Sequence, residues 1–142
     1  MPSVSSLVII NQPVEKVFNY VISVENHKAW QAGILEAKLS PPGPVGFGSI
    51  YTYTSEMMGR KFETKMAVSA FELNKKWSVK TLGIPQPVET AYAFEAVGAA
   101  TKLVVSMELS GGFPAAAEAM VKQQMQNSMT EQAQRMKQNL ER

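Results

Sequence analysis

The residues of this chain best placed to do chemistry are seven hydroxyl-bearing side chains, which fall at alternate positions of extended segments. They fall on one side of extended segments between residues 49 and 95 and are Tyr51, Tyr53, Ser55, Thr64, Thr81, Thr90 and Tyr92. Burying that many hydroxyls on one sheet face is costly unless each meets a partner, a water or a ligand. We therefore expect them to orient a ligand in a pocket. For each tyrosine alone, the alternative is a core residue whose hydroxyl reaches a neighbour.

The three tyrosines are the candidate catalytic residues. A phenol with a pKa near 10 is a workable proton donor toward a carbonyl or an enolate, but it is a poor base at neutral pH. Tyr51, Tyr53 or Tyr92 would therefore act as an acid in any reaction that the pocket supports. The chain places no Arg, Asp or His beside them by spacing, which weakens this catalytic interpretation.

Large apolar side chains complete the expected ligand-binding set. They are Trp30, Phe62, Met66, Trp77, Val79, Met107, Met125 and Met129. Methionine fills irregular gaps, so the methionines fit either a deformable wall around a ligand or ordinary core packing. Trp30 fits either the mouth of the cavity or an anchor that holds a short helix in the core.

His27 is the one side chain with an ordinary pKa near neutrality. We expect it in an exposed loop, because no carboxylate is placed by spacing to orient the ring. With one His and no Cys, thiolate chemistry and a multi-histidine metal site are excluded. A nucleophile elbow, a P-loop and a dinucleotide fingerprint are also missing from the sequence. We predict neither a metal nor a cofactor.

The elements that position these residues follow from hydrophobic periodicity. Extended patterns occupy residues 4–10, 34–39, 49–57, 61–71, 77–81, 88–95 and 102–109. Helical patterns occupy 14–21, 24–30 and 113–140, with Asn11 able to cap the first and Pro13 in its first turn. In 61–71, Ala70 falls on the same face as Thr64 and Met66. Short turns between the later strands predict an antiparallel meander with one covered face and one wet face.

Length and composition fit a single globular domain over residues 1–142, with 45% hydrophobic and 18% charged residues. The formal net charge is +2, which gives no indication of a nucleic-acid partner. No apolar run approaches the roughly 18 residues that span a bilayer, so we expect no integral membrane segment. The N-terminus has no signal-peptide pattern, and we expect a cytoplasmic protein.

Several segments resemble the START-like superfamily, also called SRPBCC or birch-pollen-allergen-like, in its polyketide cyclase/dehydrase branch. They are residues 10–18 with 26–30, residues 45–48, and residues 87–94 with 101–107. The resemblance covers nearly the whole chain and implies an α+β helix-grip fold. In it, a seven-stranded curved antiparallel sheet wraps around a long C-terminal helix, and two short helices lie between strands 1 and 2. It also implies a cavity that opens near Trp30, residues 83–87 and the start of the last helix.

Three functions remain open at this point. The first is binding of a hydrophobic small molecule, such as a lipid, an isoprenoid or a polyketide-like compound, between the sheet and the long helix. The second is a cyclase, aromatase or dehydratase that uses the cavity tyrosines as proton donors. The third is docking of a protein partner on the long helix. We favour the first, with a hydrophobic small molecule as the partner and a monomer or a homodimer as the assembly.

Overall fold

The computed structural model describes residues 3–31, 33–83, 87–109 and 115–142, and its elements follow the order expected from the sequence. The strands are β1 (Ser3–Ile10), β2 (Ile34–Ser40), β3 (Ile50–Met57), β4 (Arg60–Glu72), β5 (Lys76–Leu82), β6 (Val88–Val97) and β7 (Ala100–Leu109). The helices are α1 (Val14–Ile22), the 3₁₀ turn η1 (Val24–Asn26), α2 (His27–Trp30) and α3 (Ala115–Leu140). The expected α+β architecture is confirmed.

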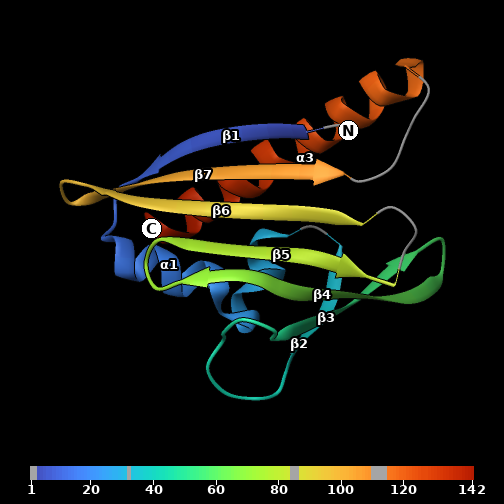
Figure 1. Ribbon diagram of the computed structural model, residues 1–142, viewed down its shortest axis with the longest axis horizontal. Helices are drawn as coiled ribbons and strands as arrows, with labels where there is room; N and C mark the ends of the chain where they lie inside the picture. Colours follow the sequence, from blue (N-terminus) through green and yellow to red (C-terminus); the bar gives the residue numbers. More distant parts are fainter. Residues whose placement is uncertain (1–2, 32, 84–86, 110–114) are drawn as a thin grey trace.

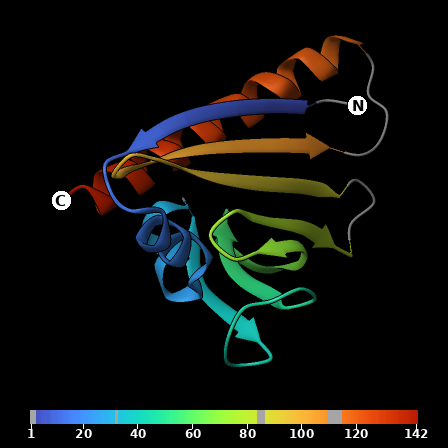
Figure 2. The same cartoon turned by 60° about the vertical axis from the view of Figure 1, so that its left-hand side comes forward.

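The seven strands form one antiparallel sheet in the order β1-β7-β6-β5-β4-β3-β2. Figure 1 shows this sheet as a single curved layer. The helix α3 runs alongside β1 and β7, and its C-terminal end lies near α1. Figure 2 shows the helices gathered on one side of the sheet. One face of the sheet is therefore covered by helices, and the other is open to solvent.

The hairpin between β3 and β4 fixes which side chains share the covered face. Its two-residue loop is Met58-Gly59, with φ angles of 55° and 78°. Two consecutive positive φ values are the signature of a type I′ turn, which suits the twist of the flanking strands. Tyr53 pairs with Thr64 and Ser55 with Phe62, so the register expected from the sequence is confirmed.

A β-bulge in β4 corrects one expectation from the sequence. The register shifts between Val68 and Ala70, so that Ala70 pairs with Ser78 and Phe71 pairs with Trp77. One extra residue in a strand reverses the side to which every later side chain points. Ala70 therefore leaves the covered face, and Phe71 turns inward to meet Phe18 with their ring centroids 5.6 Å apart.

The start of α1 also differs from the sequence expectation. Pro13 occupies the N-cap position, and no side chain caps the helix. The carbonyl of Pro13 accepts hydrogen bonds from the backbone N–H groups of Lys16 and Val17. Asn11 instead donates its backbone N–H to the carboxylate of Glu141 at 2.7 Å. The segment before α1 therefore holds the C-terminus of the chain, and its asparagine does not serve as a cap.

The long helix α3 is fastened at its C-terminal end. Gln12 donates to the carbonyl of Leu140 at 2.7 Å, and Lys137 donates to the carbonyl of Ile9 at 2.6 Å. Asn139 donates to the Tyr20 hydroxyl at 2.9 Å. The buried stripe of the helix consists of Met125, Met129, Ala133, Met136 and Leu140, which recur at helical spacings of three and four. Within the described ranges, no helix is long and apolar enough to cross a membrane.

Candidate functional site

A cavity of about 230 Å³ lies between the covered face of the sheet and the helices. Its lining comes from five strands, from α3 and from the residue after α2: Gln31, Tyr53, Met66, Trp77, Val79, Val88, Thr90, Tyr92, Met107 and Gln132. Trp77, Val79 and Tyr92 are almost completely buried, whereas Met66 and Gln132 are half-buried. The cavity is therefore closed at its aromatic end and approaches the surface at the other.

His27 lies behind this aromatic end and is completely buried, which corrects the expectation of an exposed loop histidine. Its Nε2 atom lies 2.8 Å from the carbonyl oxygen of Val21, and its Nδ1 atom lies 2.7 Å from the hydroxyl of Tyr53. A carbonyl oxygen only accepts, so Nε2 carries the proton of the neutral ring. Nδ1 is then the acceptor, and the Tyr53 hydroxyl donates to it.

Four aromatic side chains surround the imidazole. Its ring centroid is 4.9 Å from that of Tyr51, 5.1 Å from that of Trp30 and 5.8 Å from that of Trp77. Burial among these rings lowers the pKa of His27 to about 4, against the opposing effect of its bond to the Val21 carbonyl. The ring is therefore neutral at pH 7, in agreement with the tautomer that the two hydrogen bonds require.

The three tyrosines differ in what their hydroxyls do. Tyr51 donates to the buried carbonyl of Ile22 at 2.6 Å, and Tyr53 donates to His27. Tyr92 lines the cavity, and its hydroxyl makes no hydrogen bond within the described residues that would lower its pKa. Burial raises the pKa of all three phenols, so each keeps its proton at neutral pH. Tyr92 alone has a hydroxyl proton that is not already committed within the described chain.

Two indole groups beside the cavity are also left without partners. Within the described residues, the Nε1–H groups of Trp30 and Trp77 are buried and make no hydrogen bond. Each such donor costs about 1–3 kcal/mol relative to a satisfied one. Trp30 meets Tyr92 edge to face, with ring centroids 6.1 Å apart. The aromatic cluster therefore keeps hydrogen-bonding capacity that the folded chain does not use.

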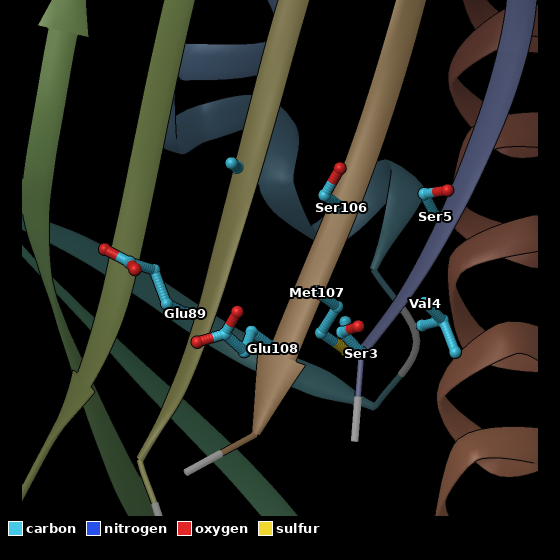
Figure 3. A pocket seen from close by; sticks show the side chains of 8 residues that line it. Ser3, Val4, Ser5, Glu89, Ser106, Met107 and Glu108 are labelled. Carbon is cyan, nitrogen blue, oxygen red and sulfur yellow. The ribbon is translucent and has the colours of Figure 1, made fainter. Parts of the chain in front are cut away.

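Other hollows on the molecule are lined differently, and one of about 590 Å³ beside α1 and β4 has a mostly apolar lining without a tyrosine. Figure 3 shows another, of about 410 Å³, over β1, β6 and β7, where Glu89 and Glu108 project from neighbouring strands and Ser106 lies farther along β7. Glu89 and Glu108 are directly paired across β6 and β7 and are exposed to solvent. No group of three His, Cys, Asp or Glu side chains able to hold a metal occurs in the described parts of the chain.

A family model described as polyketide cyclase/dehydrase and lipid transport matches residues 1–141. The chain belongs to this family. No similar sequence was found among curated proteins. The family assignment agrees with the resemblance seen in the sequence and covers every residue of the cavity lining.

Solved structures give this family member the helix-grip fold. A START superfamily protein from Mycobacterium smegmatis superposes with a TM-score of 0.78 at 19% identity, covering 98% of this chain and 97% of that one. The di-domain ARO/CYC protein StfQ from the steffimycin biosynthetic pathway gives 0.77 at 10% identity, with 99% of this chain and 50% of that one covered. Ara h 8.0201 gives 0.68 at 16% identity, covering 94% and 96%.

The structure brings seven of the predicted ligand-binding residues of this family member together around the cavity. They are Tyr53, Met66, Trp77, Val79, Thr90, Tyr92 and Met107. Eight others lie outside the lining: Trp30, Tyr51, Ser55, Phe62, Thr64, Thr81, Met125 and Met129. Trp30, Tyr51 and Met129 are fully buried in the core around the cavity. Phe62 is 45% exposed, because it lies near the tip of the β3–β4 hairpin.

Four residues at or behind the cavity were not among the predicted site residues. Val88 lines it and shares the strand parity of Thr90 and Tyr92, so the period of two could have identified it. His27 lies three residues before Trp30, a helical spacing that places both side chains on one face. Gln31 and Gln132 follow no pattern in the sequence that distinguishes them from surface glutamines.

Proposed function

We propose that this protein binds a compact, largely apolar molecule in the cavity between the sheet and α3. The observation that carries the proposal is a largely apolar cavity whose lining includes Tyr92, a buried hydroxyl that makes no hydrogen bond within the described residues. Ligand pockets commonly enclose about 300–1,000 Å³, and this one encloses about 230 Å³. That volume favours a small aromatic or short isoprenoid compound over a long-chain lipid.

The protonation states at the site support binding without chemical change. His27 has a pKa of about 4 because it is buried, so it has little capacity to take a proton at neutral pH. Tyr53 and Tyr92 have pKa values raised by burial and remain neutral acids. A site without a group that titrates near pH 7 is poorly suited to general acid–base catalysis, but it is well suited to holding a neutral ligand.

Quenching of tryptophan fluorescence tests this proposal directly, because Trp77 lines the cavity. We expect 2-naphthol to quench the wild-type protein saturably and native mass spectrometry to show one bound molecule. Val79→Phe fills the cavity and should abolish both signals. Val97→Phe introduces the same ring at an exposed position on β6 and should bind as the wild type does. Absence of saturable binding, or equal binding by Val79→Phe, would contradict the proposal.

A second candidate function is a cyclase or aromatase. Its support is the family itself, together with the fold shared with the di-domain ARO/CYC proteins StfQ and BexL. Tyr92 would then be the proton donor toward a substrate carbonyl, because the protons of Tyr51 and Tyr53 are committed. Incubation with a short aromatic-forming poly-β-ketone, analysed by mass spectrometry, distinguishes the two functions. Cyclisation that Tyr92→Phe abolishes would replace the binding proposal.

A further inference from the structure

The hydrogen bond between His27 and Tyr53 has a fixed direction. The Nε2–H group of His27 donates to the Val21 carbonyl, so the Nδ1 atom of the neutral ring has no proton and can only accept a hydrogen bond. The Tyr53 hydroxyl must then point its proton at Nδ1, 2.7 Å away. Reversing this bond would require either a second proton on the buried imidazole or the loss of the Val21 contact. The first alternative buries a positive charge, and the second leaves the Val21 carbonyl without its donor.

The oxygen of Tyr53 also belongs to the cavity side of the cluster. Tyr53 and Gln31 both line the cavity, and the Gln31 side chain lies within hydrogen-bonding reach of the Tyr53 oxygen, where it counteracts the rise in the pKa of the phenol, so a ligand would share this oxygen with the Gln31 amide. His27 does not line the cavity and approaches the hydroxyl from behind. With its proton directed away from the cavity, Tyr53 presents lone pairs to whatever occupies that space.

We propose that the cavity selects ligands that carry a hydroxyl or N–H group, which donates a hydrogen bond to the Tyr53 oxygen. Tyr53 is the specificity-determining residue, and His27 is a positioning residue that makes Tyr53 an acceptor only. This inference rests on the proposed binding function and narrows its ligand class to phenols, enols and related donors. A ligand whose polar atoms are all acceptors could accept from the Tyr92 hydroxyl, but it would leave the Tyr53 oxygen without a ligand donor.

The test compares two matched probes, 2-naphthol and its methyl ether, 2-methoxynaphthalene. Both have the same ring system, but only the naphthol has a donor. We expect the ratio of their dissociation constants to favour naphthol in the wild type and to change by about tenfold in Tyr53→Phe. Tyr20→Phe removes a hydroxyl that accepts from Asn139 outside the cavity lining, and it should leave the ratio unchanged.

Variants at His27 test the positioning role separately. The amide of His27→Gln can donate to the Val21 carbonyl and accept from Tyr53, so the preference for naphthol should persist. His27→Leu frees the Tyr53 proton, and the methyl ether should gain affinity relative to naphthol. If His27→Leu kept the wild-type ratio, the positioning role would be refuted.

A measurement on the wild type keeps the proposal falsifiable if the His27 variants fail to fold. The ¹⁵N chemical shifts of the imidazole should show a protonated Nε2 and an unprotonated Nδ1, both with and without 2-naphthol. A protonated Nδ1 would overturn the proposal. Failure of both probes to bind the wild type would refute the binding function itself. Saturable binding with equal affinities that Tyr53→Phe does not alter would refute only the selection of donors.

Discussion

The covered face of the sheet has two ends, and tyrosine side chains line a cavity at only one of them, because the hollows at the α1 end have no tyrosine in their lining. At the end beneath α1, Phe18 meets Phe71 and Phe94 edge to face, with ring centroids 5.6 and 5.0 Å apart. Val17, Phe18 and Val21 are completely buried there, and the packing is apolar. At the other end, Tyr53 and Tyr92 line a space of about 230 Å³, and the His27 imidazole lies behind Tyr53.

The elements that cover the two ends explain the difference. The helix α1 directs a compact apolar stripe onto β6 and β7, and large rings fill the interval. At the cavity, the cover consists of Gln31 and of Gln132 on α3, whose amide groups are not suited to filling an apolar space. The same strands therefore carry a packed apolar cluster at one end and the proposed binding cavity at the other. We expect substitutions at the two ends to have different consequences.

The largest effect should come from removing a ring at the closed end. Phe18→Ala should lower the free energy of unfolding by about 3–5 kcal/mol, because it leaves a large void among packed rings. Met66→Ala, at a half-buried position on the cavity wall, should cost about 1–2 kcal/mol. Urea unfolding of both variants measures the comparison. Equal losses would show that the cavity end is packed as tightly as the closed end.

Acid should destabilise the folded protein through His27, which lies behind the cavity. His27 has a pKa of about 4 in the folded protein against about 6.5 when unfolded, so the unfolded state binds more protons between these values. Its contribution is fully present above pH 6.5 and is lost as the pH falls to 4, by about 3 kcal/mol in total. His27→Gln should flatten the pH dependence of urea unfolding in this interval. An unchanged slope would contradict the burial of a neutral ring.

A smaller effect is expected at Tyr51, which supports the site without lining it. Tyr51→Phe leaves the buried carbonyl of Ile22 without its donor and should cost about 1–3 kcal/mol. The affinity for 2-naphthol should stay at the wild-type value, because Tyr51 does not line the cavity. Thermal unfolding and fluorescence titration measure the two quantities. A loss of affinity would place Tyr51 within the binding site.

The smallest effect on stability should come from adding volume at the cavity. Val79→Phe enters existing space and should change the free energy of unfolding by less than about 1 kcal/mol. Val21→Phe adds the same volume at the closed end, where overpacking should cost about 1–3 kcal/mol. Urea unfolding separates the two variants. Equal costs would mean that the cavity is too small to accept a ring.

Much of the fold was predictable because period-two and helical patterns are encoded locally. The register of β3 on β4 followed from the alternation and the short turn, and the buried stripe of α3 followed from its spacing. The bulge near Ser69 was not predictable, because one inserted residue leaves the composition of the strand unchanged. The inward direction of Phe71 becomes evident only from the pairing of β4 with β5, in which Val68 faces Val79 and Ala70 faces Ser78.

The site was less predictable than the fold because its polar contacts join distant segments. Strand parity correctly placed Tyr53, Trp77 and Tyr92 on the covered face. The sequence places no carboxylate beside His27, whereas the structure supplies the carbonyl of Val21 and a phenol 26 residues away as its partners. Backbone carbonyls have no sequence signature, so the burial of His27 became evident only from the packing of α2 against β3.

Because α3 is held mainly at its C-terminal end, we expect local unfolding of the helix to begin at its N-terminal end. Contacts with Gln12, Tyr20 and Ile9 hold its last turns, whereas Gln126 reaches the carbonyl of Ser5 at a longer 3.3 Å. Local unfolding begins where fewer contacts must break. Backbone amide protons in the first turns of α3 should therefore exchange with deuterium sooner than those beside Leu140, and the helix should loosen from that end inward.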